Sequence, residues 1–205
     1  ATGGRAGRHL RRSQALPINP APPGGGGGQY KPLSISDMEQ IYEMALRLLE
    51  DLGVGEVPGR LRDLFVQQGA RFEVGRIHIP RRLIAQAIAS APKTITLHGR
   101  DAARSIQVGG DRVHFGTGGA AVQTLDLDSG DYRASTLQDL YDFARLQDQL
   151  TNVSWFTRCC VATDLVREEA LDVNTAYALL VGTSKPVATS FTLAEHVAPI
   201  VKMMD

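Results

Sequence analysis

The sequence predicts an α/β fold in which helices connect parallel strands. Within residues 136–192, two segments with apolar residues at helical spacing alternate with two short segments rich in aromatic and β-branched residues, Val153–Thr157 and residues 187–191. Parallel strands joined by a helix require a right-handed crossover, and repetition of this unit gives either an open doubly wound sheet or a closed barrel. In both folds ligands bind at the carboxyl ends of the strands, where we expect the functional residues.

Capping signals delimit the helices of this region. The first begins after Ser135-Thr136, which together with Asp139 has the pattern of an N-terminal cap, and the second ends at Gly182. After the second strand comes an amphipathic segment that reaches the last residue. Because the sequence begins with Ala1 rather than methionine and stops inside that segment, we expect it to be part of a longer protein.

Residues 1–31 combine arginine, proline and glycine, including five consecutive glycines at 24–28, and contain no acidic residue. Such a segment has too little apolar surface to offset the entropy of ordering, so we expect a disordered basic arm. The rest of the chain has 17 basic and 22 acidic residues. This mildly acidic body argues against a nucleic-acid partner, and no apolar run is long enough to indicate a membrane span.

Residues 32–135 are expected to form a helical and antiparallel β-meander extension. Its first helix opens with the capping box Ser36-Asp37-Met38-Glu39 and carries one apolar stripe as far as Gly53. The other predicted elements of its first half are a helix at residues 58–68, short strands at residues 71–73 and 76–79, and a helix that ends before Pro92.

From Thr94 onward the apolar period changes from 3.6 to 2. Short alternating segments near residues 94–98, 106–108 and 113–115 are separated by glycine-containing turns, a pattern typical of an antiparallel meander. A hairpin with strands at residues 122–127 and 132–133 follows. The alternating strand-helix units are therefore expected only in residues 136–205.

Two local patterns bear on cofactor and metal binding. Gly116-Thr117-Gly118-Gly119 satisfies the glycine pattern of dinucleotide-binding proteins, but the strand-like residues 122–127 stand where a helix N-terminus is needed. A sharp bend, or a loop pressed close to a ligand, is the favoured interpretation. The five histidines show no metal-ligand spacing, so we expect no metal site.

Two cysteines and two aromatic residues lie in or just after a predicted strand. Cys159 and Cys160 are adjacent, a pair that rarely forms a disulfide, which favours a reduced cytoplasmic setting; buried cysteine is the commoner role for both. Trp155 and Phe156 near the end of a strand are open to two interpretations. Their rings either contribute to a cage for a quaternary ammonium or pack under the helices, because parallel strands are buried on both faces.

With these residues in view, the chain resembles the amino-terminal part of the trimethylamine:corrinoid methyltransferase family, whose members include glycine betaine enzymes. The resemblance runs from about Tyr30 to the end. It is strongest in Ile77-His78-Ile79-Pro80, Leu97-His98-Gly99-Arg100-Asp101, Phe115-Gly116-Thr117-Gly118-Gly119, Asp128-Ser129-Gly130-Asp131-Tyr132-Arg133 and Thr136-Leu137-Gln138-Asp139.

The resemblance implies a (β/α)8 TIM-type barrel, here partial, that follows an N-terminal extension. It also implies a cytoplasmic enzyme that moves a methyl group from trimethylamine, or from a quaternary amine such as glycine betaine, to the cobalt of a separate corrinoid protein. On this view the chain binds no cofactor itself, and its partners are the corrinoid protein and a small methylated amine; a homo-oligomeric state is left open. Pyrrolysine, which marks the trimethylamine enzymes, would lie beyond position 205, so the amine is not assigned.

Strand geometry predicts where substrate would bind, although it identifies no catalytic residue. If the strands near residues 113–115, 153–156 and 187–190 share one sheet, the residues after them face a common mouth. The predicted substrate-binding residues are Thr117, Gly118, Gly119, Phe156, Thr157, Arg158, Ser190 and Thr192. The alternative function is a non-catalytic binding or assembly module derived from such a barrel.

Overall fold

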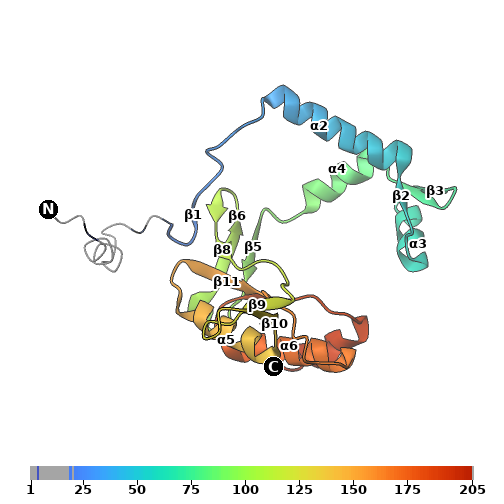
Figure 1. The fold of residues 1–205 in the computed structure, drawn as a ribbon. Helices are drawn as coiled ribbons and strands as arrows, with labels where there is room; N and C mark the ends of the chain where they lie inside the picture. Colours follow the sequence, from blue (N-terminus) through green and yellow to red (C-terminus); the bar gives the residue numbers. More distant parts are fainter. Residues whose placement is uncertain (1–3, 5–18, 20, 205) are drawn as a thin grey trace. The chain divides into compact units, whose positions relative to one another are not determined.

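The computed structural model describes residues 4, 19 and 21–204, without the side chains of residues 168 and 169 (Figure 1). Most of the predicted basic arm lies outside the described residues. The chain divides into two compact units, a smaller one formed by Gly28–Lys93 and a larger one formed by residues 1–27 together with Thr94–Asp205. The boundary expected at residue 135 falls inside the larger unit.

The smaller unit combines helices with a three-stranded antiparallel sheet in the order β2-β4-β3. Ile77 on the central strand is fully buried, and the guanidinium of Arg81 forms ion pairs with Glu43 at 2.6 Å and Glu50 at 3.0 Å. The elements are α2 (Ile35–Arg47), the π-helical turn η1 (Leu48–Leu52), β2 (Val54–Gly55), α3 (Gly59–Gln67), β3 (Arg71–Glu73), β4 (Arg76–His78) and α4 (Arg81–Ser90).

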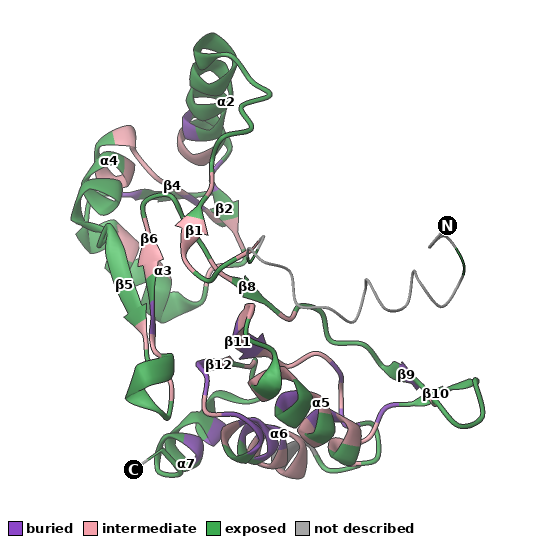
Figure 2. Cartoon of the chain, turned by 90° about the vertical axis from the view of Figure 1, so that its left-hand side faces the viewer, coloured by how far each residue is buried: buried purple, intermediate pink, exposed green. Residues whose placement is uncertain are grey.

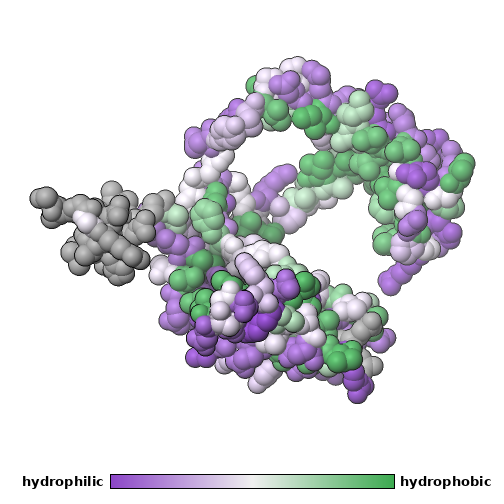
Figure 3. Space-filling view, in the orientation of Figure 1, coloured by the Kyte–Doolittle hydropathy of each residue, from purple (hydrophilic) through white to green (hydrophobic). Residues whose placement is uncertain are grey.

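The start and the exposure of α2 differ from expectation. Ser34, not Ser36, is the N-cap: its hydroxyl accepts from the Asp37 amide, while the Asp37 carboxylate accepts from the Ser34 amide at 3.0 Å. The predicted apolar stripe is largely exposed, with Met38, Ile41 and Tyr42 each about half accessible to solvent. Figure 2 shows most of α2 as exposed, and Figure 3 shows hydrophobic side chains gathered on this unit.

The larger unit is built on three parallel strands in the order β12-β11-β8. They are β8 (Phe115–Gly116), β11 (Val153–Thr157) and β12 (Val187–Ala188), connected by α5 (Leu137–Gln149) and α6 (Glu168–Gly182). The predicted α/β class is confirmed. The partial barrel is not, because these short strands form no closed barrel in the part of the chain that the structure describes.

Helices α5 and α6 cover one face of this sheet. Along β11, Ser154 and Phe156 are buried, whereas Val153, Trp155 and Thr157 are half-buried, so alternate side chains point toward the helices. Gly182 allows the helices to approach closely, since a Cβ at this position would overlap the Cβ of Ala144. The core of the unit consists of Leu140, Ala144, Phe156, Cys160, Ala178 and Leu179.

The antiparallel region is confirmed only in part. β5 (Thr94–Leu97) pairs with β6 (Ile106–Gly109) as predicted, but β7 (Arg112–Val113) pairs with β1 (Gly25–Gly26) and does not continue the meander. The Gly24 amide donates to the Val113 carbonyl at 2.9 Å. Gly25–Gly26, within the expected arm, therefore form a short strand. Glycine makes this pairing sterically feasible, because a Cβ at Gly27 would overlap the side chain of Val113.

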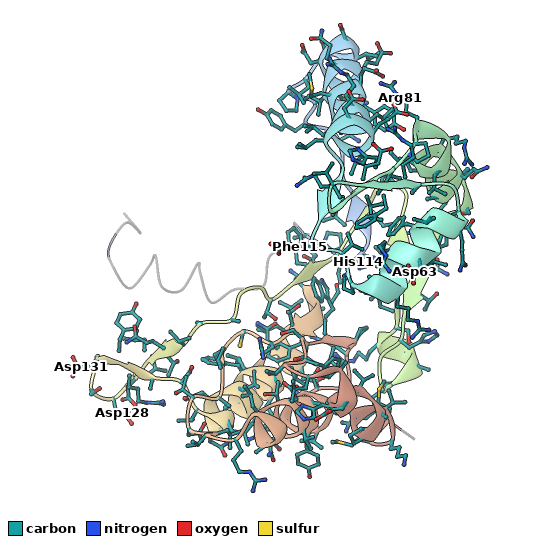
Figure 4. All side chains as sticks on the ribbon, turned by 90° about the vertical axis from the view of Figure 1, so that its right-hand side faces the viewer. Asp63, Arg81, His114, Phe115, Asp128 and Asp131 are labelled. Atoms are coloured by element: carbon teal, nitrogen blue, oxygen red, sulfur yellow. The ribbon has the colours of Figure 1, made fainter. Side chains whose placement is uncertain are left out.

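The predicted hairpin is present as β9 (Gln123–Leu125) and β10 (Tyr132–Ala134), and Figure 4 shows Asp128 and Asp131 at its tip. The cap of α5 is also as predicted, with Thr136 and Asp139 bonded reciprocally. Short helical turns complete the unit: η2 (Ala102–Arg104), η3 (Ala194–His196) and α7 (Val197–Val201). Within the described ranges, no helix combines the length and hydrophobicity that a membrane span requires.

Candidate functional site

The segments that follow the three parallel strands meet at the carboxyl edge of the sheet. Thr117, directly after β8, uses its hydroxyl as both donor and acceptor toward β11: Oγ1 donates to the Thr157 carbonyl at 2.7 Å and accepts from the Thr157 amide at 2.8 Å. The side chain thereby takes the place of a backbone partner. The structure thus brings together two of the predicted site residues from different strands.

A second link joins the segments after β11 and β12. Arg158 donates from Nη2 to Ser190 Oγ at 2.9 Å, and its backbone amide donates to the Ala188 carbonyl at 3.1 Å. Both side chains are at least partly accessible to solvent. A guanidinium held in this way presents positive charge at the carboxyl edge of the sheet, where it would favour an anionic group on a ligand.

The glycines of the loop after β8 have open space around them. A Cβ at Gly118 or Gly119 would meet no heavy atom within 4 Å, and Gly119 has a φ of +85°, a conformation that favours glycine. The expected bend is therefore present. Parallel pairing resumes at once, because the Ala121 amide donates to the Cys159 carbonyl at 3.0 Å.

Phe156 does not lie on the same side as the other predicted residues. Its side chain is 0% exposed and packs in the core beneath α5 and α6, so the packing interpretation holds for this ring. Alternation along β11 places Trp155 and Thr157 on the opposite face. Thr157 Oγ1 is buried there and has no hydrogen-bond partner among the described residues.

Sequence reasoning missed a buried histidine–carboxylate pair next to Thr192. Asp172 on α6 accepts from His196 Nδ1 at 2.7 Å, from the Thr192 amide at 2.7 Å and from Thr192 Oγ1 at 3.0 Å. The two residues are 24 positions apart, so no local spacing in the sequence indicates the pair. The sequence does contain one indication that Asp172 is buried, because it lies on the same helix face as the apolar Ala176 and Leu179.

The adjacent cysteines have different environments. Cys160 is buried in the core, whereas Cys159 is half-buried. A hydrogen bond between the thiols lowers the pKa of Cys159, while the same bond and burial raise the pKa of Cys160 far above its ordinary value. Cys160 therefore stays protonated at neutral pH and acts as a small core residue, the commoner role expected from the sequence.

Comparison with known proteins identifies relatives that are all named as methyltransferases. Glycine betaine methyltransferase of Desulfitobacterium hafniense is 30% identical over 61% of this chain and 26% of its own length. Trimethylamine methyltransferase MttB of the same species is 28% identical over 83% of the chain and 34% of its own length. L-carnitine:corrinoid methyltransferase of Eubacterium limosum is 34% identical over 55% of the chain and 23% of its own length.

The matched region spans about a quarter to a third of the length of these relatives. The family described as trimethylamine methyltransferase (MTTB) is matched by residues 1–205. Because that match covers the whole sequence, the chain belongs to the trimethylamine methyltransferase family.

Proposed function

We propose that the protein containing this chain is a corrinoid-dependent methyltransferase, with a methylated amine as methyl donor and the cobalt of a separate corrinoid protein as acceptor. The observation that carries the proposal is the family match over residues 1–205. The names of its relatives support the substrate class, because they include trimethylamine, glycine betaine, L-carnitine and proline betaine enzymes. The corrinoid enters as the cargo of the partner protein.

The proposed substrate site is the carboxyl edge of the parallel sheet, formed by Thr117, Gly118, Gly119, Thr157, Arg158, Ser190 and Thr192. In the reaction the bond between the methyl carbon and nitrogen breaks, a carbon–cobalt bond forms, and the amine leaves with the bonding electron pair. The chain's task would be to bind the cationic amine and to place the methyl group in line with the acceptor. The open space at Gly118 and Gly119 would leave room for a ligand beside the loop.

If an aromatic ring contacts the amine cation, Trp155 is the better candidate than Phe156. Trp155 lies on the sheet face away from the helices, whereas Phe156 lies in the core. A cation over an indole face is stabilised by about 0.5 to 2 kcal/mol. Arg158 would suit the carboxylate that a betaine or carnitine carries in addition to its quaternary nitrogen.

The decisive experiment uses the whole protein with its corrinoid partner reduced to the Co(I) state. Trimethylamine, glycine betaine, carnitine and proline betaine are added singly, and conversion of Co(I) to methyl-Co(III) is followed by visible absorbance. We expect one of these amines to methylate the cobalt only when the protein is present. Absence of methyl transfer from every methylated amine would refute the proposed activity.

The substrate site is tested separately with Trp155→Leu and Arg158→Gln, and with Gln149→Ala on the exposed end of α5 as a control. Loss of a cation–π contact should raise the KM for the active amine by roughly threefold to thirtyfold in Trp155→Leu. Gln149→Ala should leave the KM unchanged. Unchanged kinetics in both site variants would mean that the carboxyl edge of this sheet does not contact the substrate.

A further inference from the structure

A cavity lies at the end of the parallel sheet where the strands begin, opposite the carboxyl edge. It has a volume of about 420 Å³ and belongs entirely to the larger unit. Val153 and Ser154, the first residues of β11, line it, and so do Lys185, just before β12, and His114, just before β8. Figure 4 labels His114 beside Phe115, the first residue of β8. The proposed substrate residues follow the opposite ends of the same strands.

The cavity lining carries positive charge. Arg104, Arg112 and Lys185 line it, and no aspartate or glutamate does so among the described residues. Arg104 donates from Nη1 to the Asp148 carbonyl at 3.2 Å, and Arg112 donates from Nη1 to the Gly109 carbonyl at 3.3 Å. The acceptors of both bonds are uncharged backbone oxygens. The Asp148 carboxylate interacts electrostatically with Arg104 and Lys185, but it does not line the cavity.

Lys185 is buried in the same region. Its ammonium donates to the Gln147 carbonyl at 2.6 Å and to the Leu150 carbonyl at 2.8 Å. An ammonium group has three donors, so one is left for a ligand. Burial lowers the pKa of Lys185, as does the nearby Arg104, and a bound anion would oppose both effects.

Two buried polar atoms in the lining have no partner within the described part of the chain. Ser154 Oγ is one of them, on a residue that is only 6% exposed. The other is His114 Nδ1, whose ring holds its second nitrogen 2.9 Å from the Gln107 carbonyl oxygen. A buried hydroxyl without a partner is costly, and such groups in folded proteins call for an explanation such as a ligand.

We propose that this cavity is a binding site for a small organic molecule that carries a phosphate or carboxylate group. Two guanidinium groups, one ammonium group and a serine hydroxyl are donors that suit an oxyanion. The volume exceeds what a single phosphate group fills, which leaves room for the rest of the molecule. Pro23 and Gly24 also line the cavity, so the segment just before β1 is part of the site.

The test is isothermal titration calorimetry of the purified protein with pyrophosphate and, in a second arm, citrate, both at constant ionic strength set by chloride. We expect saturable binding of at least one of the two probes. Tighter binding of pyrophosphate would indicate a phosphorylated ligand, and tighter binding of citrate a carboxylic acid. Absence of saturable binding in both arms would overturn the proposal.

Charge variants separate this site from general electrostatic attraction. Arg112→Gln should weaken the probe about tenfold, because it removes a charge-assisted hydrogen bond. The matched control is Arg145→Gln, at an exposed position on α5. This substitution removes the same charge at a residue that does not line the cavity. Equal weakening by both variants would show that only the net charge of the protein matters.

Ser154→Ala gives a readout that a structural role would not produce. The change removes a buried hydroxyl that has no hydrogen-bond partner among the described residues, so the thermal unfolding temperature should stay the same or rise. Affinity for the probe should nevertheless fall by about threefold or more. Unchanged affinity in this variant would exclude contact between the ligand and Ser154 and would contradict the proposed site.

Discussion

Asp172 connects α6 with the segment that follows β12. In addition to His196 and both polar groups of Thr192, it accepts from the Leu193 amide at 3.3 Å. Burial acts to raise the pKa of this carboxyl, but the hydrogen bonds outweigh burial and hold the pKa below its ordinary value of 3.8. The carboxylate therefore stabilises the fold fully above that pH, and the contribution is lost as the pH falls through the lower folded-state pKa.

Asp172→Asn should destabilise the larger unit by about 2 to 4 kcal/mol at neutral pH, because an amide cannot accept from all of these donors. Urea denaturation followed by circular dichroism measures the change. Asp142→Asn, at an exposed position on α5, should cost less than about 0.5 kcal/mol. The difference in stability between the two variants should narrow as the pH falls below 3.8 and through the lowered pKa of Asp172. Equal stabilities at neutral pH would contradict this account.

Phe156 and Trp155 are sequence neighbours with opposite roles in the structure. Phe156→Ala should cost about 3 to 5 kcal/mol, because it leaves a cavity under α5 and α6. The half-buried Trp155 should be less sensitive, so Trp155→Leu is expected to cost less than half as much. Denaturant unfolding of both variants, followed by circular dichroism, tests the difference. A larger loss for Trp155→Leu would reverse the assignment of the two faces of β11.

At the scale of elements, the contact between β8 and β11 requires glycine at position 116. A Cβ at Gly116 would overlap the indole ring of Trp155, whereas a Cβ at Gly118 would meet nothing within 4 Å. Gly116→Ala should therefore displace the ring and cost about 1 to 3 kcal/mol. Trp155 is the sole tryptophan in the sequence, so intrinsic fluorescence reports its environment directly. Gly118→Ala should leave the spectrum unchanged, and an identical shift in both variants would count against the contact.

The pairing of β1 with β7 makes the N-terminal glycines part of the larger unit. Deletion of residues 1–27 removes the bonds from Gly24 to Val113 and from Gly27 to Asp111. We expect a loss of about 1 to 3 kcal/mol and faster hydrogen exchange in residues 106–113, because the partner strand is gone. A matched deletion of residues 1–18 should have little effect on exchange in that segment. Equal protection of residues 106–113 in both deletions would mean that the β1–β7 pairing does not stabilise this segment.

Local sequence patterns predicted most helices and strands. Most of the features that they did not predict depend on pairing between residues far apart in the sequence. The cap of α5 and the hairpin β9–β10 were accessible because their determinants lie within a few residues. The β1–β7 pairing and the Asp172–His196 contact join residues far apart in sequence, and a polyglycine run carries no pattern that indicates a strand. The sequence also left undetermined which face of the sheet Phe156 lies on. Alternation along a strand defines two faces but does not say which of them the helices cover.

At the scale of the whole molecule, alternation of strands and helices predicted a parallel sheet but not its extent. Each of β8 and β12 pairs with β11 alone, so both have an outer edge without a strand partner among the described residues. Closure into a barrel requires a set number of strands with matched stagger, which three short strands do not provide. In the smaller unit, the apolar stripe of α2 stays exposed at Met38, Ile41 and Tyr42.

The outer edges of β8 and β12 and the exposed apolar stripe of α2 predict how the 205-residue chain behaves as an isolated polypeptide. Unpaired strand edges and exposed apolar surface favour association with further copies, so we expect sedimentation velocity to show oligomers that grow with protein concentration. Ala188→Lys places a charge on the outer strand β12 and should reduce this association. Gln149→Lys, on the exposed end of α5, adds the same charge away from the edge and should change it less. A monomer at every concentration, with cooperative thermal unfolding, would show that the exposed edges and stripe do not drive self-association.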